Sequence, residues 1–169
     1  MPFTRPKGLN HVAYITWDTE ATVKFYTEVL GMRLVGHALG DQVGSTGEPS
    51  EFLHAFFEME DGSCIAFFEV EGVPRVQPEP AIPPWVRHIA LSVGSMEELL
   101  DARRRLEERG IEVRGVVDHE GIWSSIYFFD PNGVRLELTY QRVPLDEEHA
   151  RKAREAVEAW TRGRKAATV

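Results

Sequence analysis

The sequence of 169 residues is poor in cysteine and has no long apolar segment. Cys64 is the single cysteine, so the chain cannot form an intramolecular disulfide or a cysteine-rich zinc site. No apolar run approaches the roughly 18 residues that span a membrane, and the N-terminus lacks the apolar stretch of a secretion signal. We therefore expect a cytoplasmic protein in a reducing compartment.

Basic side chains are also in deficit, with 19 Lys and Arg against 27 Asp and Glu and a formal net charge of −8. Nucleic-acid binding draws its affinity from contacts between basic side chains and phosphates, so this balance argues against DNA or RNA as a partner. The length and the 43% of hydrophobic residues fit one domain over residues 1–169, or two small modules that share a core.

What the chain does contain is an internal repeat. Residues 10–15 (NHVAYI) and 87–92 (RHIALS) each have the pattern of a short apolar strand with histidine at its second position. A capped helix follows each strand, at 19–30 after Asp18 and at 96–109 after Ser95. Both halves therefore begin with the same strand and helix.

Each half also ends with a turn and a strand, at 63–68 and at 134–140. The histidines are 77 residues apart and the turn glycines, Gly62 and Gly133, are 71 apart, so the first half has about six extra residues. A surface loop over 39–50 accounts for this surplus. Each half is predicted to be a βαβββ module.

These patterns predict an α+β fold of two tandem βαβββ modules, which form a curled mixed sheet around a metal-centred cavity with the helices outside. A proline-rich connector at 71–84 separates the modules, and an amphipathic helix at 145–164 packs on the body or on a second subunit. A homodimer is expected. The predicted divisions are a first module at 8–72, a second module at 85–142 and a C-terminal helical tail at 143–169.

Equivalent positions of the two modules carry metal-ligating side chains. His11 and His88 occupy the same place in the repeat, and Glu137 lies four residues after its turn glycine, where the first half has Ala66. Two imidazoles and one carboxylate with open positions form the set that non-haem Fe(II) uses to bind oxygen and substrate together. We therefore predict a metal site at His11, His88 and Glu137, with Fe(II) preferred and Mn(II) as the alternative. Glu69, three residues after Ala66, should face the opposite side of its strand.

Apolar and aromatic side chains near these strands predict a pocket for a planar organic substrate. Helix-side core is the alternative position for about half of them, because the phase of every strand is not fixed by the sequence. The predicted substrate-binding residues are Phe52, Phe56, Phe68, Trp123 and Phe129, with Cys64, Ala66 and Tyr140 as further candidates for the wall.

Residues 8–142 resemble the vicinal oxygen chelate superfamily, which includes glyoxalase I, methylmalonyl-CoA epimerase, bleomycin- and fosfomycin-resistance proteins and type I extradiol ring-cleavage dioxygenases. Residues 117–137 (VDHEGIWSSIYFFDPNGVRLE) are similar to the extradiol dioxygenase signature. The resemblance implies that Tyr127 and His119 are catalytic and hold a catecholate oxygen and dioxygen. If 131–133 form an odd-length hairpin loop, Tyr127 lies opposite Glu137 on one face of the sheet.

The sequence departs from that pattern in one place. Extradiol enzymes of this type carry an acid–base histidine about fourteen residues before the second ligand histidine, but 63–85 contains no histidine. His54 or His37 could substitute for it. We expect an Fe(II)-dependent dioxygenase that acts on a small aromatic substrate and O2. The alternatives are a glyoxalase- or epimerase-like lyase or isomerase, and a drug-sequestering protein without catalysis.

Overall fold

The computed structural model describes residues 6–75, 82–83 and 85–166, so the predicted connector lies partly outside the described residues. The elements are β1 (His11–Thr16), α1 (Thr19–Lys24), η1 (Phe25–Val29), β2 (Arg33–Gln42), β3 (Pro49–Glu58), β4 (Cys64–Val70), β5 (Ile89–Ser92), α2 (Met96–Glu108), β6 (Arg114–His119), β7 (Trp123–Phe129), β8 (Arg135–Gln141) and α3 (Glu147–Ala166).

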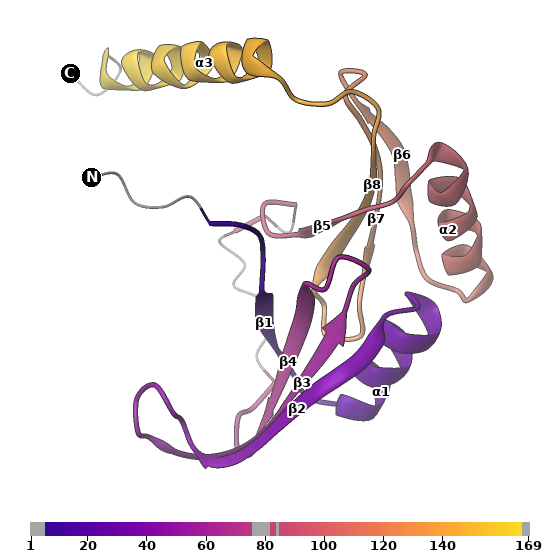
Figure 1. The fold of residues 1–169 in the computed structure, drawn as a ribbon, viewed down its shortest axis with the longest axis vertical. Coiled ribbons are helices and arrows are strands. Elements are labelled where there is room, and N and C mark those ends of the chain that lie inside the picture. Colours follow the sequence, from indigo (N-terminus) through magenta and orange to yellow (C-terminus); the bar gives the residue numbers. More distant parts are fainter. Residues whose placement is uncertain (1–5, 76–81, 84, 167–169) are drawn as a thin grey trace.

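The strands form two four-stranded sheets with the same topology, β1-β4-β3-β2 and β5-β8-β7-β6 (Figure 1). β1 is parallel to β4 and β5 is parallel to β8, and the other neighbours are antiparallel. The predicted α+β fold with two βαβββ units is thereby confirmed. The two sheets remain separate and open in the described residues, whereas the sequence predicted one curled sheet around a cavity.

The helices begin where their capping residues predict. The side chain of Asp18 accepts a hydrogen bond from the backbone of Ala21, and that of Ser95 accepts one from the backbone of Glu98. Glu98 reaches back to accept from the backbone N–H of Gly94 at 2.7 Å, which completes a capping-box arrangement. After α1, the π-helical turn η1 continues the predicted first helix.

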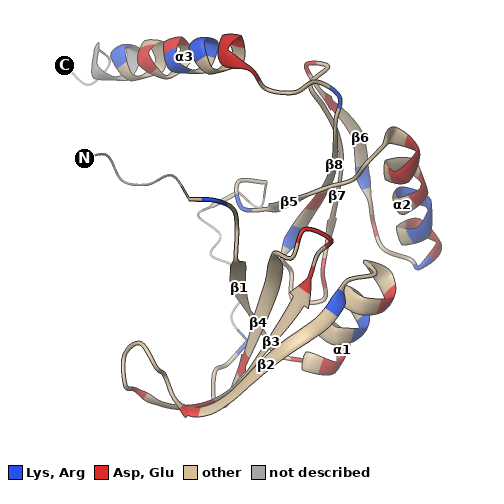
Figure 2. Ribbon diagram, in the orientation of Figure 1, with Lys and Arg blue, Asp and Glu red and all other residues tan. Residues whose placement is uncertain are grey.

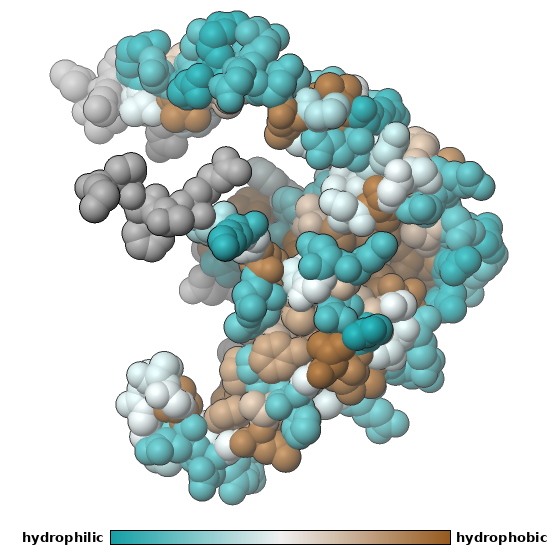
Figure 3. Space-filling model, viewed as in Figure 1, coloured by the Kyte–Doolittle hydropathy of each residue, from teal (hydrophilic) through white to brown (hydrophobic). Residues whose placement is uncertain are grey.

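The loop predicted at 39–50 is shorter than expected. Leu39 pairs with Leu53 and Gln42 pairs with Pro49, so most of this segment belongs to the β2–β3 hairpin. Because ladder pairing satisfies backbone N–H and C=O groups, the strands extend through a stretch that is rich in glycine and serine. The space-filling view shows this hairpin as an arm that stands out from the body (Figure 3).

α1 and α2 lie on the same side of the two sheets, and the hydrophobic core lies between helices and strands (Figure 1). Phe57 and Phe67 of the first sheet are buried there, as are Leu99 of α2 and Leu136 of the second sheet. The ring of Phe25 lies 6.5 Å from that of Phe128, centroid to centroid, so η1 connects the two halves. One face of each sheet is thus used for stability and the other is left free.

A polar network also joins the modules. Asn132, in the turn before β8, donates to the hydroxyl of Thr22 at 3.0 Å and accepts from that of Thr16 at 2.9 Å. Asp130 accepts from the buried hydroxyl of Tyr26 at 3.2 Å. The turn of the second module is therefore bonded to the strand and helix of the first.

α3 is present close to its predicted bounds, but within the described residues it does not pack extensively on the body. It projects from the end of β8, away from α1 and α2 (Figure 1). Acidic and basic residues alternate along it (Figure 2), and Val157 and Trp160 remain 66% and 69% exposed. In the described residues no surface of the body covers the apolar stripe of α3, and packing of this helix on a second subunit stays a prediction.

Substitutions of Asp130 test the hydrogen bonds that join the two modules. The Asp130 carboxylate also accepts from the backbone N–H groups of Asn132 and Val134, at 2.9 and 2.7 Å. Asp130→Ala leaves these buried donors unpaired and is expected to lower the free energy of unfolding by about 3 kcal/mol. Asp130→Asn keeps an acceptor oxygen and should stay within about 1 kcal/mol of the wild type in urea unfolding.

The pH dependence of unfolding checks the same residue. Burial raises the pKa of Asp130 above its ordinary value near 3.8, so the folded state binds this proton more tightly than the unfolded state. This contribution to stability is present at low pH and is lost as the pH rises through the raised pKa. Asp130→Asn should lack that component, and parallel pH curves for the two proteins would contradict this account.

Candidate metal centre and substrate site

The free face of the second sheet carries two of the three predicted metal ligands in contact with each other. Ala90 of β5 pairs with Glu137 of β8, and His88 lies two residues before Ala90 on the same face. Nε2 of His88 is 3.0 Å from Oε2 of Glu137. Two ligand atoms that each lie about 2.1 Å from one ion, at a right angle, are about 3.0 Å apart. The pair therefore has the spacing of adjacent metal ligands.

The two predicted catalytic residues are on the same face. Tyr127 pairs directly with Glu137 across β7 and β8, as the hairpin spacing predicted. The hydroxyl of Tyr127 lies 2.8 Å from Nε2 of His119, which comes from β6. Sequence reasoning missed Arg135, whose guanidinium lies over the Tyr127 ring at 4.4 Å from its centroid. Its place two residues before Glu137 is the signal that could have found it.

The electrostatic surroundings keep the Tyr127 phenol protonated. Burial raises its pKa, and the negative charge of Glu137 adds to this effect. A hydrogen bond with Ser125 and the positive charge of Arg135 act in the opposite direction. Because the net shift is upward from 10.0, Tyr127 is a hydrogen-bond donor at neutral pH.

The free face of the first sheet carries the third predicted ligand, His11. His11 pairs with Cys64, and Ala13 with Ala66, across parallel strands β1 and β4. No carboxylate occupies the position of Ala66, the first-module equivalent of Glu137. Glu69 lies on the opposite face, as predicted, and accepts from the backbone N–H of Thr19 at 2.9 Å.

His11 and His88 each have a hydrogen-bond acceptor beside the ring nitrogen Nδ1. Nδ1 of His11 lies 2.7 Å from Oδ1 of Asn10, and Nδ1 of His88 lies 3.2 Å from the carbonyl oxygen of Trp85. A hydrogen on Nδ1, donated to these acceptors, would leave the Nε2 lone pair for a metal ion, which is the usual arrangement of metal-bound histidines. The donor chemistry of this chain therefore fits a divalent metal ion.

Within the described residues, no three His, Cys, Asp or Glu side chains converge as a group that could hold a metal. His88 and Glu137 meet on the second sheet, and His11 lies on the first sheet beside His54, with their ring centroids 6.0 Å apart. The predicted ligand set is thus divided between the free faces of two sheets that do not close on each other.

The predicted substrate-binding residues are divided in the same way. Strand alternation places all five on free faces: Phe52, Phe56 and Phe68 on the first sheet, Trp123 and Phe129 on the second. Two of them, Phe52 and Phe68, line one cavity of about 420 Å³. Tyr140, a further candidate, pairs with Ser124 and packs against the hydrophobic core, so its assignment to the pocket wall is wrong.

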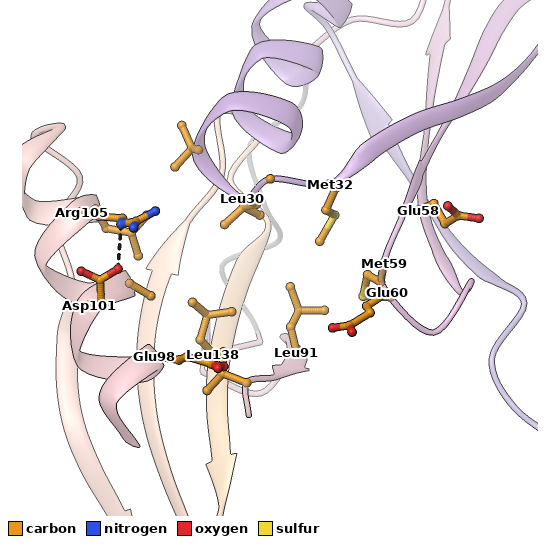
Figure 4. Close-up of a pocket in the computed structure, with 15 residues that line it drawn as sticks. Leu30, Met32, Glu58, Met59, Glu60, Leu91, Glu98, Asp101, Arg105 and Leu138 are labelled. Atoms are coloured by element: carbon orange, nitrogen blue, oxygen red, sulfur yellow. Dashed lines mark ion pairs between the residues drawn. The ribbon is translucent and has the colours of Figure 1, made fainter. Parts of the chain in front are cut away.

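A second cavity, of about 410 Å³, lies at the seam between the modules on the helix side (Figure 4). Met32, Met59 and Leu91 project into it, and acidic side chains surround them. Asp101 at its edge is paired with Arg105 at 2.7 Å. This cavity lies on the core side of the sheets, so the predicted ligands do not line it.

Two βαβββ units of the same topology define the class of protein to which this chain belongs. The chain belongs to the Glyoxalase/Bleomycin resistance protein/Dioxygenase superfamily, whose family model matches residues 8–138. This superfamily contains metal-dependent enzymes that act on small molecules. Among the described residues, no helix is long and apolar enough to cross a membrane.

Two curated relatives have different activities in their names. The chain is 31% identical over 135 residues to MhqA of Bacillus subtilis (strain 168), whose name assigns it a ring-cleaving dioxygenase activity; the match covers 78% of this chain and 40% of MhqA. It is 30% identical over 132 residues to the metallothiol transferase FosB of Bacillus licheniformis, with 78% of this chain and 73% of FosB covered. The chain thus spans less than half the length of MhqA.

A solved structure supports the fold. The fosfomycin resistance protein FosX from Listeria monocytogenes, crystallised with Mn(II) and sulfate, superimposes with a TM-score of 0.57 at 22% identity. The match covers 82% of this chain and 96% of FosX. FosX thus shares the fold of this chain.

Proposed function

We propose that this protein is an Fe(II)-dependent extradiol-type dioxygenase that cleaves a catechol-like aromatic substrate. The observation that carries the proposal is the placement of the His88–Glu137 pair next to the Tyr127–His119 pair on one sheet face. The first pair supplies metal ligands and the second supplies proton-bearing groups. The name of MhqA and the similarity of residues 117–137 to the extradiol signature agree with this assignment.

His11, His88 and Glu137 would hold the metal through two Nε2 atoms and one carboxylate, with Mn(II) as the alternative ion. Bound there, the ion would supply Lewis-acid activation of the diol and the redox capacity toward O2 that no side chain has. In the overall reaction both atoms of O2 enter the product as the ring carbon–carbon bond beside the diol breaks, so no other reductant is required.

The side chains around the metal position would orient the substrate and handle protons. The Tyr127 hydroxyl, held in its protonated form, donates to a diol oxygen, and a proton can pass between this hydroxyl and Nε2 of His119, 2.8 Å away. Arg135 over the Tyr127 ring keeps the phenol in place. The aromatic side chains on both free faces would exclude water from the ring.

The site would be completed between two copies of the chain. His11 of one chain would join His88 and Glu137 of a second chain, because the described residues of one chain gather no three ligands. A homodimer of this kind contains two equivalent sites, as expected from twofold symmetry. It would also bring the free face of the first module, which carries Phe52, Phe56 and Phe68, against the free face of the second module, which carries Glu137.

The lyase or isomerase alternative lacks support at one position. Proton transfer beside a chelated carbonyl would use a carboxylate at the position of Ala66, and the methyl group there cannot act as a base. A non-catalytic binding protein would need the cavity but not the intact ligand set. Metal binding and turnover therefore separate the three functions.

Metal binding is the first test. Wild-type protein is expected to bind one Mn(II) per chain, and His88→Ala or Glu137→Gln should weaken binding by at least about 100-fold, since losing a supporting residue alone costs 10- to 100-fold. Equilibrium dialysis with metal analysis measures both. His37→Ala, on an exposed position of β2, is the matched control and should bind normally. Equal stoichiometry in wild type and His88→Ala would overturn the assignment.

Turnover is the second test. Protein loaded with Fe(II) under anaerobic conditions and then exposed to a panel of catechols in air is expected to form yellow ring-fission products with matching oxygen uptake. Tyr127→Phe should lower kcat by about 100-fold because it removes a hydrogen-bond donor from the reacting oxygen. Tyr140→Phe, on the core side of the same sheet, should keep its activity. Failure to turn over any diol would exclude the dioxygenase.

A further inference from the structure

His54 is a buried polar side chain that the proposed mechanism does not use. It lies on β3, is 8% exposed and has no hydrogen-bond partner for Nε2 within the described part of the chain. Its ring stacks on Phe68 with centroids 3.5 Å apart and lies 4.2 Å from that of Phe56. Leaving a buried polar group unpaired costs free energy, so such a group is a candidate for contact with a ligand.

The same histidine lines a cavity. Ala38, Val43, Phe52, Phe68 and Val70 form the apolar part of the wall of the cavity of about 420 Å³, and His54 is its only imidazole. Among the residues that the structure describes, no charged side chain lines it. This volume and lining suit a planar, uncharged molecule of one or two rings. Gly40 lies against Phe52, and a Cβ added there would lie 2.8 Å from the ring, so the absent side chain leaves room for Phe52.

Strand register separates His54 from a similar residue on the other face. His54 pairs with Ala38 of β2, and the residue before Ala38, His37, pairs with Ala55. His54 therefore faces the cavity and His37 faces away from it. Rotating the His54 imidazole by 180° exchanges the positions of its ring nitrogens and carbons and leaves the shape of the side chain unchanged. Either orientation of the ring is therefore compatible with the packing, and a nitrogen can face the cavity.

We propose that His54 is a specificity-determining residue that hydrogen-bonds an uncharged hydroxyl or carbonyl group of an aromatic ligand packed on Phe52 and Phe68. The inference rests on the proposed function only in taking this ligand to be the dioxygenase substrate. The group that His54 recognises is then a ring substituent other than the two diol hydroxyls. A carboxylate is disfavoured because the cavity wall offers no cation to compensate its desolvation.

Small probes on the metal-free full-length protein test this inference without turnover. Wild-type protein is expected to bind phenol about tenfold more tightly than toluene or benzoate, as one added hydrogen bond in an apolar site allows. His54→Phe should bind phenol and toluene equally, whereas His37→Phe should keep the preference. Ligand-observed NMR titrations measure all of these affinities.

The imidazole signals of the wild-type protein give a readout that needs no variant to fold. Phenol is expected to shift the ring ¹⁵N resonances of His54 and to leave those of His37 unchanged. An unchanged His54 signal at saturating phenol, or a His54→Phe variant that retains the tenfold preference, would overturn the proposal. Mn(II) binding measured on the same samples tests the metal site separately, so failure of one proposal is distinguishable from failure of the other.

Discussion

Strand alternation is the constraint on which the rest of this structure depends. In each sheet, one set of side chains packs against α1 or α2 and the alternate set is left on the free face. Phe57 and Phe67 stabilise the first sheet, and Leu136 and Leu138 the second. Because the core uses only one face, substitutions on the other face can change ligand chemistry with little effect on folding. The predicted metal ligands His11, His88 and Glu137, the Tyr127 phenol and the aromatic side chains predicted to bind substrate all lie on the free faces.

The two modules share a fold but differ in chemistry. The second free face carries charged and hydroxyl groups, including Glu137, Arg135 and Tyr127. The first carries His11 and His54 among phenylalanines, with Ala66 where the second module has its glutamate. In the proposed function, the second module supplies the acid–base groups and the first holds the apolar part of the substrate.

Much of this could be predicted from the sequence, because the repeat aligns equivalent strands and the alternation then fixes the facing residues. The pairing of Tyr127 with Glu137 and the position of Glu69 on the helix side of its sheet follow from counting residues in strands and turns. The same alternation could have excluded Tyr140 from the pocket wall, because Tyr140 lies three residues after Glu137 and therefore faces the core. The separation of the sheets could not be predicted, because neither the repeat nor strand alternation specifies how one sheet lies against the other.

The position of His54 was equally inaccessible to sequence reasoning. A histidine in an apolar strand has no motif around it, and only the β2–β3–β4 register shows that it faces a cavity and not the core. The partners of the ligand histidines, Asn10 and the carbonyl of Trp85, also lie outside any motif. Tertiary contacts decide all of these features.

Isolated heterodimers test directly whether a metal site forms between two chains. A heterodimer of one His11→Ala chain and one His88→Ala chain, purified through two different tags, has one intact site if the ligands come from different chains. The account predicts one Mn(II) per heterodimer. The reciprocal heterodimer, of wild type with a chain carrying both substitutions, should bind none. No metal in the first heterodimer and one Mn(II) in the second would contradict the account.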